Sequence, residues 1–198
     1  MSGIIGDNTG RGTGLIKAAG GGDFVKLGAV TASGSSTVAF DGLYTSAYNI
    51  YKIYGSKLLP ATNSQDLTYQ VNISNSAHST AEYVYGSGKS YIDTSPTHYW
   101  TTGMASDFDN PHTAVTLSND TQLWDAYHAG TFEMTIYDPL STAAWKIIDT
   151  RWSFSDASFQ SYYNNLLVKN TAANTGVTIK YASGNVASGV FTLYGLTV

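Results

Sequence analysis

The sequence predicts an all-β protein, a jelly-roll-like β-sandwich with an extended N-terminal arm. Two stretches dense in aromatic and β-branched residues lead to this prediction: AYNIYKIYGSKLLP (47–60) and GVFTLYGL (189–196). Such residues suit a pleated, half-buried strand, and large apolar groups on both faces favour a central position in a sheet. Frequent turn signals separate many further short strands, which is typical of sandwiches and jelly rolls.

Composition favours one β-rich body that works inside an assembly. The chain has 198 residues, and 42% of them are apolar, which is enough for a sizeable core. Only 12% are charged, about half the usual share. Solubility therefore depends on Ser, Thr, Asn and Gly, and such a surface suits a protein that is partly covered by partners.

Charge and cysteine content exclude several classes of function. The net charge of −4 and the absence of a basic cluster argue against nucleic-acid binding. The chain has no cysteine, so disulfides and thiolate metal sites are excluded. No apolar run approaches the roughly 20 residues that span a bilayer, and no secretion signal is evident. We expect synthesis in a cytoplasm and no membrane partner.

The first 26 residues differ from the rest of the chain. They are rich in glycine, which raises the entropy lost on ordering, so we expect this segment not to fold alone. It still carries apolar side chains that a purely solvating tail would not need. We therefore interpret 1–26 as an arm that orders against a partner and 27–198 as the sandwich body. The expected contact residues of the arm are Ile4, Ile5, Arg11, Leu15 and Ile16.

The body is expected to be a succession of strands. We expect an early pair at 25–32 and 37–40, the long strand at 47–59, and a half-buried strand with one wet face at 67–73. Further strands are expected at 82–86, 130–137, 145–154, 166–168, 177–181 and 186–196. Residues 87 to about 115 lack periodicity, and long irregular segments are often functional. Residues 155–165 are expected to form a polar connection.

No catalytic constellation is evident. Gly10–Gly14 lacks the strand and the downstream Lys-Ser/Thr of a phosphate loop, and Asp107, Asp109 and Asn110 form only a partial cation-binding pattern. The four histidines share no ligand spacing, and the only two glutamates, Glu82 and Glu133, lie far apart in sequence. We therefore expect no enzymatic activity, no cofactor and no metal.

Aromatic residues in the expected loops are candidates for stacking on sugar rings. The same residue types are enriched in protein interfaces and can also fill a core, so those alternatives stay open. The candidates for glycan or interface contacts are Tyr99, Trp100, Trp124, Tyr127, Tyr162 and Tyr163.

Three segments give the chain a resemblance to structural proteins of tailed bacteriophages. The start MSGIIGDNTGRGTGLIKA is similar to the first residues of many such proteins. The aromatic strand followed by Leu59-Pro60-Ala61-Thr62-Asn63, and the closing strand 188–195, resemble a β-rich module of phage virion proteins. The resemblance implies a non-enzymatic head decoration, head fibre or tail component, often a trimer, with no catalytic residues.

The leading hypothesis is a capsid decoration or cement protein on the virion surface, attached through its arm to the major capsid protein or another virion protein. The body is expected to form a homotrimer. The alternative is a tail or fibre module that binds host surface glycans through its aromatic loops. An enzyme such as a polysaccharide depolymerase is the third reading, and the paired acids that it usually needs are not evident.

Both long strands are expected to contribute buried side chains, Tyr51 and Leu193 among them. Replacing Leu193 with Ala should lower the free energy of unfolding by roughly 2–5 kcal/mol, as large-to-small core substitutions do. Urea denaturation monitored by tryptophan fluorescence measures the change. A near-neutral result would show that this face of the closing strand is not core.

Overall fold

The structure is a computed structural model, and it describes residues 24–92, 98–105, 109–117, 129–155 and 158–196. The regular structure in this part of the chain is all strand. The strands are β1 (Phe24–Ser35), β2 (Val38–Asp41), β3 (Ile50–Pro60), β4 (Leu67–Ile73), β5 (Ser76–Ala77), β6 (Tyr83–Ile92), β7 (His98–Ala105), β8 (Val115–Thr116), β9 (Gly130–Tyr137), β10 (Lys146–Ser155), β11 (Phe159–Val168), β12 (Asn174–Tyr181) and β13 (Val186–Leu196). Residues 24–26, which the sequence assigned to the arm, are the start of β1.

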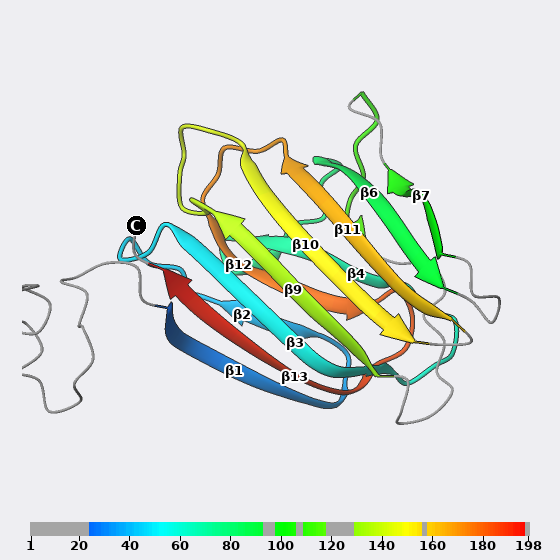
Figure 1. Cartoon of the computed structure of the whole chain (residues 1–198). Coiled ribbons are helices and arrows are strands. Elements are labelled where there is room, and N and C mark those ends of the chain that lie inside the picture. The colour runs from blue at the N-terminus through cyan, green and yellow to red at the C-terminus, as the bar shows by residue number, and fades with distance from the viewer. Residues whose placement is uncertain (1–23, 93–97, 106–108, 118–128, 156–157, 197–198) are drawn as a thin grey trace, which may run out of the picture.

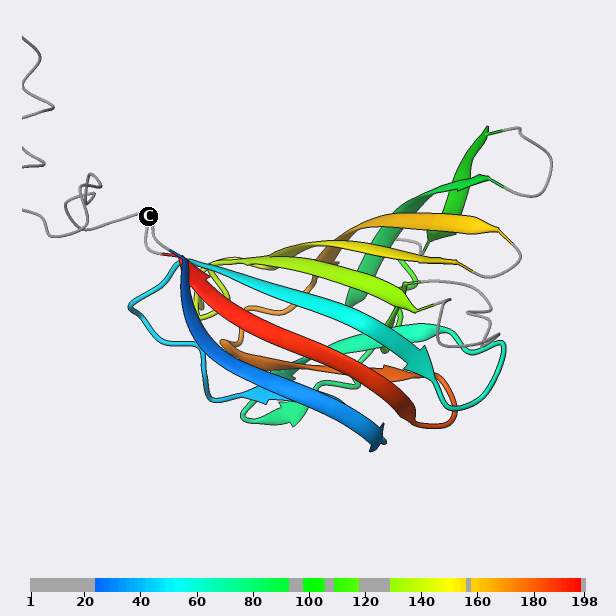
Figure 2. The same ribbon diagram turned by 60° about the horizontal axis from the view of Figure 1, so that its bottom comes forward.

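The strands form two sheets that pack face to face (Figures 1 and 2). The large sheet has eight strands in the order β1-β13-β3-β9-β10-β11-β6-β7. The small sheet has the order β2-β12-β4-β5, and β8 also pairs with β4. Two layers of antiparallel strands around one apolar core are a β-sandwich, as the sequence predicted.

Eight of the strands follow the jelly-roll order. Among β1–β4, β8, β9, β12 and β13, the first strand pairs with the last, the second with the next to last, and so on inward. β13 also pairs with β3, and β12 also pairs with β4. This nested pairing forms the two Greek keys of a jelly roll. β1 and β2 are therefore in opposite sheets, and the expectation that they pair was wrong.

Two insertions enlarge one of the jelly-roll sheets. β10 and β11 are inserted between β9 and β12, and the β6–β7 hairpin is inserted between β4 and β8. They continue the large sheet beyond β9, each antiparallel to its neighbour, and the hairpin forms its far end (Figure 2). As a result, the large sheet has a broad outer face.

The core lies between the sheets and is rich in aromatic residues. Tyr51 and Leu193 are fully buried, which confirms the sequence prediction. The Tyr51 hydroxyl donates to the Thr45 carbonyl and accepts from the Thr45 amide, both at 2.7 Å, so its burial leaves no orphaned polar atom. Trp152 and Phe154 add further ring contact, with centroids 5.7 Å apart.

Two segments form more strand than the sequence predicted. β6 runs on to Ile92 and is followed by β7, in a region that we expected to be irregular. Residues 159–168, mostly expected to be a connection, form β11, a long strand paired on both sides. In both segments, each face of the strand carries a mixture of polar and aromatic residues. The sequence therefore shows no alternation of apolar and polar residues, which is the pattern that predicts a strand.

β4 does not have the wet face that its alternating sequence predicted. Thr68, Gln70 and Asn72 are all buried although they alternate with apolar residues. The Gln70 side-chain amide donates to the Thr113 carbonyl at 2.9 Å, and the Asn72 amide donates to Asp41 at 2.6 Å. Polar side chains on this strand are thus satisfied by protein groups instead of water.

A close approach at Gly130 fixes how β9 meets β10. A Cβ added at Gly130 would overlap the indole ring of Trp152, which is fully buried. Gly86 on β6 is a matched control, because nothing lies within 4 Å of a Cβ added there. We expect Gly130→Ala to lower the free energy of unfolding by about 1–3 kcal/mol through overpacking, and Gly86→Ala to be near neutral. Equal effects in urea denaturation would contradict this packing.

Candidate binding surface on the outer face of the large sheet

A row of apolar side chains crosses the outer face of the large sheet. Its seven members lie on seven successive strands, and each is the direct cross-strand partner of the next. We call this set the apolar row: Phe24 (β1), Leu196 (β13), Ile50 (β3), Tyr137 (β9), Ile147 (β10), Leu167 (β11) and Val84 (β6). Directly paired side chains on one face are in contact, so the row is continuous.

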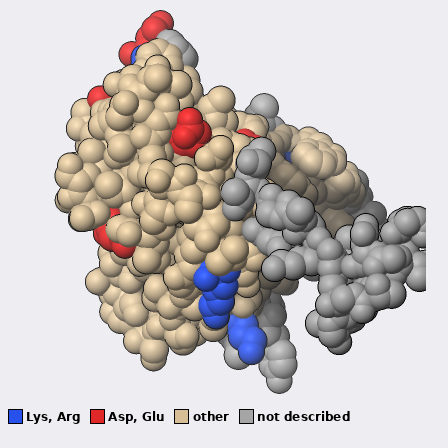
Figure 3. Space-filling model, turned by 90° about the vertical axis from the view of Figure 1, so that its left-hand side faces the viewer, with Lys and Arg blue, Asp and Glu red and all other residues tan. Residues whose placement is uncertain are grey.

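The apolar row is open to solvent within the described fold. Phe24, Tyr137 and Ile147 are 49%, 39% and 54% exposed, and the other members are half-buried. Trp145, directly before β10, is also exposed. Contiguous exposed apolar side chains are uncommon on monomeric proteins and mark interaction sites. Figure 3 shows that charged side chains are sparse at the end of the molecule where the row begins.

Lys52, Glu133 and Asp149 lie beside the apolar row on the same face, and each is hydrogen-bonded to a neighbouring side chain. Lys52 on β3 forms an ion pair with Glu133 on β9 at 3.0 Å. Burial lowers the pKa of Lys52, but the hydrogen bond to Glu133 and the negative charge of that carboxylate help raise it above its ordinary value, so the ammonium stays protonated. Asp149 on β10 accepts from the Asn165 amide at 2.8 Å and from the Tyr137 hydroxyl at 3.2 Å.

A stack of two rings and a guanidinium lies farther along the same face. The Trp100 ring of β7 stacks on the Tyr163 ring of β11 with centroids 6.0 Å apart. The guanidinium of Arg151 on β10 lies over the same tyrosine, 5.2 Å from its centroid. Trp100 and Tyr163 are exposed. The stack holds Arg151 by cation–π attraction, and the Arg151 side chain is itself exposed.

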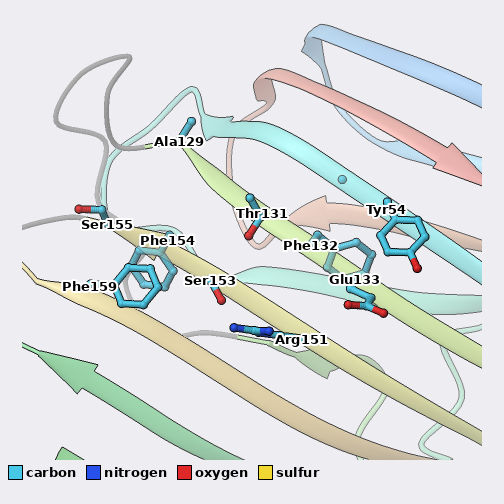
Figure 4. A pocket seen from close by; sticks show the side chains of 11 residues that line it. Tyr54, Ala129, Thr131, Phe132, Glu133, Arg151, Ser153, Phe154, Ser155 and Phe159 are labelled. Atoms are coloured by element: carbon cyan, nitrogen blue, oxygen red, sulfur yellow. The ribbon is translucent and has the colours of Figure 1, made fainter. Parts of the chain in front are cut away.

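Next to Arg151 the outer face is hollowed (Figure 4). The hollow has a volume of about 490 Å³. It forms because outward positions on β9 and β10 carry the small residues Thr131 and Ser153, while longer side chains stand around them. The lining residues are Tyr54, Gly55, Ala129, Thr131, Phe132, Glu133, Arg151, Ser153, Phe154, Ser155 and Phe159. Phenyl and phenol rings, hydroxyls, a carboxylate and a guanidinium therefore meet in one depression.

The predicted aromatic contact residues that the structure describes lie in three different environments. Trp100 and Tyr163 come together in the stack, and Tyr99 lies on the opposite face of β7, stacked on Tyr91 with centroids 4.8 Å apart. Tyr162 is buried, parallel to Phe154, and is not available to a glycan or a partner. The sequence alone could not separate Tyr162 from Tyr163, since one residue shifts the side chain to the other face.

The other predicted contacts lie outside the described residues. These are Trp124, Tyr127 and the arm residues Ile4, Ile5, Arg11, Leu15 and Ile16. Gly10–Gly14 and Asp107 of the partial cation pattern also lie outside them.

Sequence reasoning missed the apolar row and the hollow. The alternation in 130–137 predicted that Glu133 points away from the core, but not which residues stand beside it. The row and the hollow arise from the register between strands that are far apart in sequence, and no local pattern encodes that register. The one available signal was an apolar residue near one end of a strand, on the face that otherwise carries polar residues. Tyr137 and Ile147 are examples.

The described residues hold no cluster that could bind a metal. No group of three or more His, Asp or Glu side chains with suitable placement occurs in them. His78 instead contacts Glu82 at 2.6 Å, and His98 contacts the Ser90 hydroxyl at 2.8 Å. In the same part of the chain, no helix is long and apolar enough to cross a membrane.

Comparison with known proteins gives little information beyond the fold. No family model and no curated protein sequence matches the chain. Two similar solved structures carry the titles "Structure of infectious bursal disease virus Gx strain" (TM-score 0.17, 11% identity) and "Crystal structure of infectious bursal disease virus VP2 subviral particle" (TM-score 0.16, 12% identity). They cover 88% and 85% of this chain, which spans 40% of the length of each. This likeness to viral capsid proteins is weak, and we therefore argue from this chain's own strand order and surface.

Proposed function

We propose that this protein is a non-enzymatic structural component of a bacteriophage virion surface, a capsid decoration protein attached through its N-terminal arm. One observation carries the proposal: a jelly-roll body presents a sparsely charged outer face that an apolar row crosses from β1 to β6. A jelly roll is a frequent architecture of viral capsid domains. The resemblance of the chain start and of the two aromatic strands to phage virion proteins supports the same role.

The apolar row supports self-association. Six inter-strand steps of about 4.8 Å give the row a length of about 29 Å, which is comparable to a protein interface. The row lies on a rigid sheet, so little order is lost when it is covered. We propose that three copies pack with their rows toward a common axis, which forms the homotrimer that the resemblance implies. The trimer would hide Phe24, Tyr137 and Ile147, three of the exposed apolar side chains of the described fold.

The position of the arm fits this arrangement. The chain enters the body at Phe24, which is itself the first member of the apolar row. A trimer about the rows would therefore deliver three arms close to one another. Once one arm is bound to a capsid protein, the others bind at a high effective concentration, so each arm can be weak.

The glycan-binding alternative has its own supporting observation, the aromatic stack beside the hollow. Exposed rings at fixed positions on a rigid sheet suit a sugar, and jelly rolls also occur as lectin domains. This alternative places the protein at a tail or fibre, and it does not conflict with a trimer.

The trimer is tested by placing a charge in the row. Ile147→Asp should convert the trimer to a monomer in light scattering at micromolar concentration, because burying an unpaired carboxylate is unfavourable. Val190→Asp is the matched control, since Val190 is also exposed on this face but lies outside the row. The control should stay trimeric, and both variants should keep the thermal transition within a few degrees. A wild-type protein that is monomeric would contradict the proposal.

Deletion of residues 1–22 tests the arm. The deletion leaves β1 intact, so the thermal transition should stay within a few degrees. The truncated protein should no longer be incorporated into particles, as measured by quantitative mass spectrometry of purified particles. Normal incorporation of the truncated protein, or its unfolding, would show that the arm has a different role.

A further inference from the structure

The hollow beside Arg151 has the chemistry of a saccharide site. Sugar rings present apolar C–H faces and a rim of hydroxyls, so they suit a site with aromatic walls and polar groups at fixed positions. Here Tyr54 and Phe159 supply the walls, with 42% and 52% of their surface exposed. Thr131 and Ser153 supply hydroxyls on the floor between them (Figure 4).

The dimensions of the hollow indicate more than one sugar ring. Its volume of about 490 Å³ lies in the range of small-molecule sites, about 300–1,000 Å³. Tyr54 is on β3 and Phe159 is on β11, with β9 and β10 between them. Three inter-strand steps separate the two rings laterally by about 14 Å, which exceeds the width of one ring. The hollow therefore fits an oligosaccharide that reaches from one aromatic wall toward the other.

The floor is built on rigid elements. Thr131 and Ser153 are direct cross-strand partners, and Ser153 pairs in turn with Ser161 on β11. The Ser153 and Ser161 hydroxyls are hydrogen-bonded at 2.5 Å. Gly55 on β3 and the buried rings of Phe132 and Phe154 lie beneath the hollow. Polar groups on central strands are pre-organised, which limits the entropy lost on binding.

The charges of the side chains at the hollow indicate which kind of saccharide it would bind. Glu133 is neutralised by Lys52 at 3.0 Å, whereas Arg151 forms no ion pair with any described residue and is held by Tyr163. Glu133 is also the direct cross-strand partner of Arg151, but its carboxylate is already hydrogen-bonded to Lys52. Lys52, Glu133 and Arg151 together therefore leave one positive charge at the hollow, in a protein whose net charge is −4. The planar fork of Arg matches a carboxylate, and one guanidinium balances its single charge. A phosphate group carries about −1.5 to −2 and would lack a second cation.

We propose that the hollow binds an oligosaccharide that carries carboxylate groups. Arg151 receives one carboxylate, Tyr54 and Phe159 pack against ring faces, and Thr131 and Ser153 bond ring hydroxyls. The proposal rests on the hollow and not on the virion role, and the two fail separately, because binding is measured on the isolated protein.

Calorimetric titration of the full chain at low salt tests the proposal. The acidic probes are tetragalacturonate, tetramannuronate and sialyllactose, and the neutral probes are maltotetraose and lactose. At least one acidic probe should bind about tenfold or more tightly than its neutral counterpart, as expected for a charge-assisted hydrogen bond. Citrate, a carboxylate without a sugar ring, should bind more weakly than that probe.

Two variants separate the parts of the site. Arg151→Gln should reduce the affinity for the acidic probe to the level of the neutral one, while Tyr54→Ala should weaken both. Lys180→Gln removes the same charge from β12 of the small sheet and should change neither. Arg151 and Tyr54 are both exposed, so both variants should fold normally, which circular dichroism checks.

Three outcomes would overturn the proposal. The first is that no acidic probe binds at millimolar concentration. The second is that citrate binds as tightly as the acidic saccharide, which would indicate a simple anion site. The third is that Arg151→Gln and Lys180→Gln weaken binding equally, because the effect would then come from overall charge.

Discussion

The insertion of β13 between β1 and β3 is the constraint on which the rest of the structure depends. β13 is the last strand, yet it pairs along its length with β1 on one side and β3 on the other. This pairing brings the end of β13 beside the start of β1, and it places the fully buried Phe191 and Leu193 in the core. Such long-range pairings join strands that are far apart in sequence, so we expect slow, cooperative folding.

The same pairing creates the surface that we propose to be functional. Once β13 is fixed, the register passes from strand to strand through β3, β9, β10 and β11 to β6. One apolar residue near the same end of each strand then becomes a continuous row. The inserted strands lengthen that row and add Arg151, Tyr163 and Trp100. The insertions thus broaden the outer face of one sheet of a jelly roll, and their inward side chains, such as Trp152 and Phe154, extend the core beneath it.

Much of the fold could be predicted from the sequence, because the core strands alternate clearly. β9 was predicted with its observed bounds, and β3 and β13 were recognised as central by their aromatic content. Residues 159–165 of β11 could not be predicted as strand, since Tyr162 and Tyr163, like Asn164 and Asn165, place the same residue type on both faces. The binding surface was harder still. The neighbours of Arg151 are determined by the pairing of strands that are far apart in sequence. The hydrogen-bond partners of the buried polar residues of β4 cannot be predicted from the sequence for the same reason.

The central claim is that the apolar row is covered when the protein is in its particle. Hydroxyl-radical footprinting of purified particles, read by mass spectrometry, tests it most directly. Tyr137 in the row and Tyr54 at the hollow are exposed to similar extents in the fold, 39% and 42%, so they form an internal pair. The account predicts that Tyr137 is protected on the particle while Tyr54 stays reactive. Equal reactivity of the two tyrosines, or absence of the protein from the particles, would contradict it.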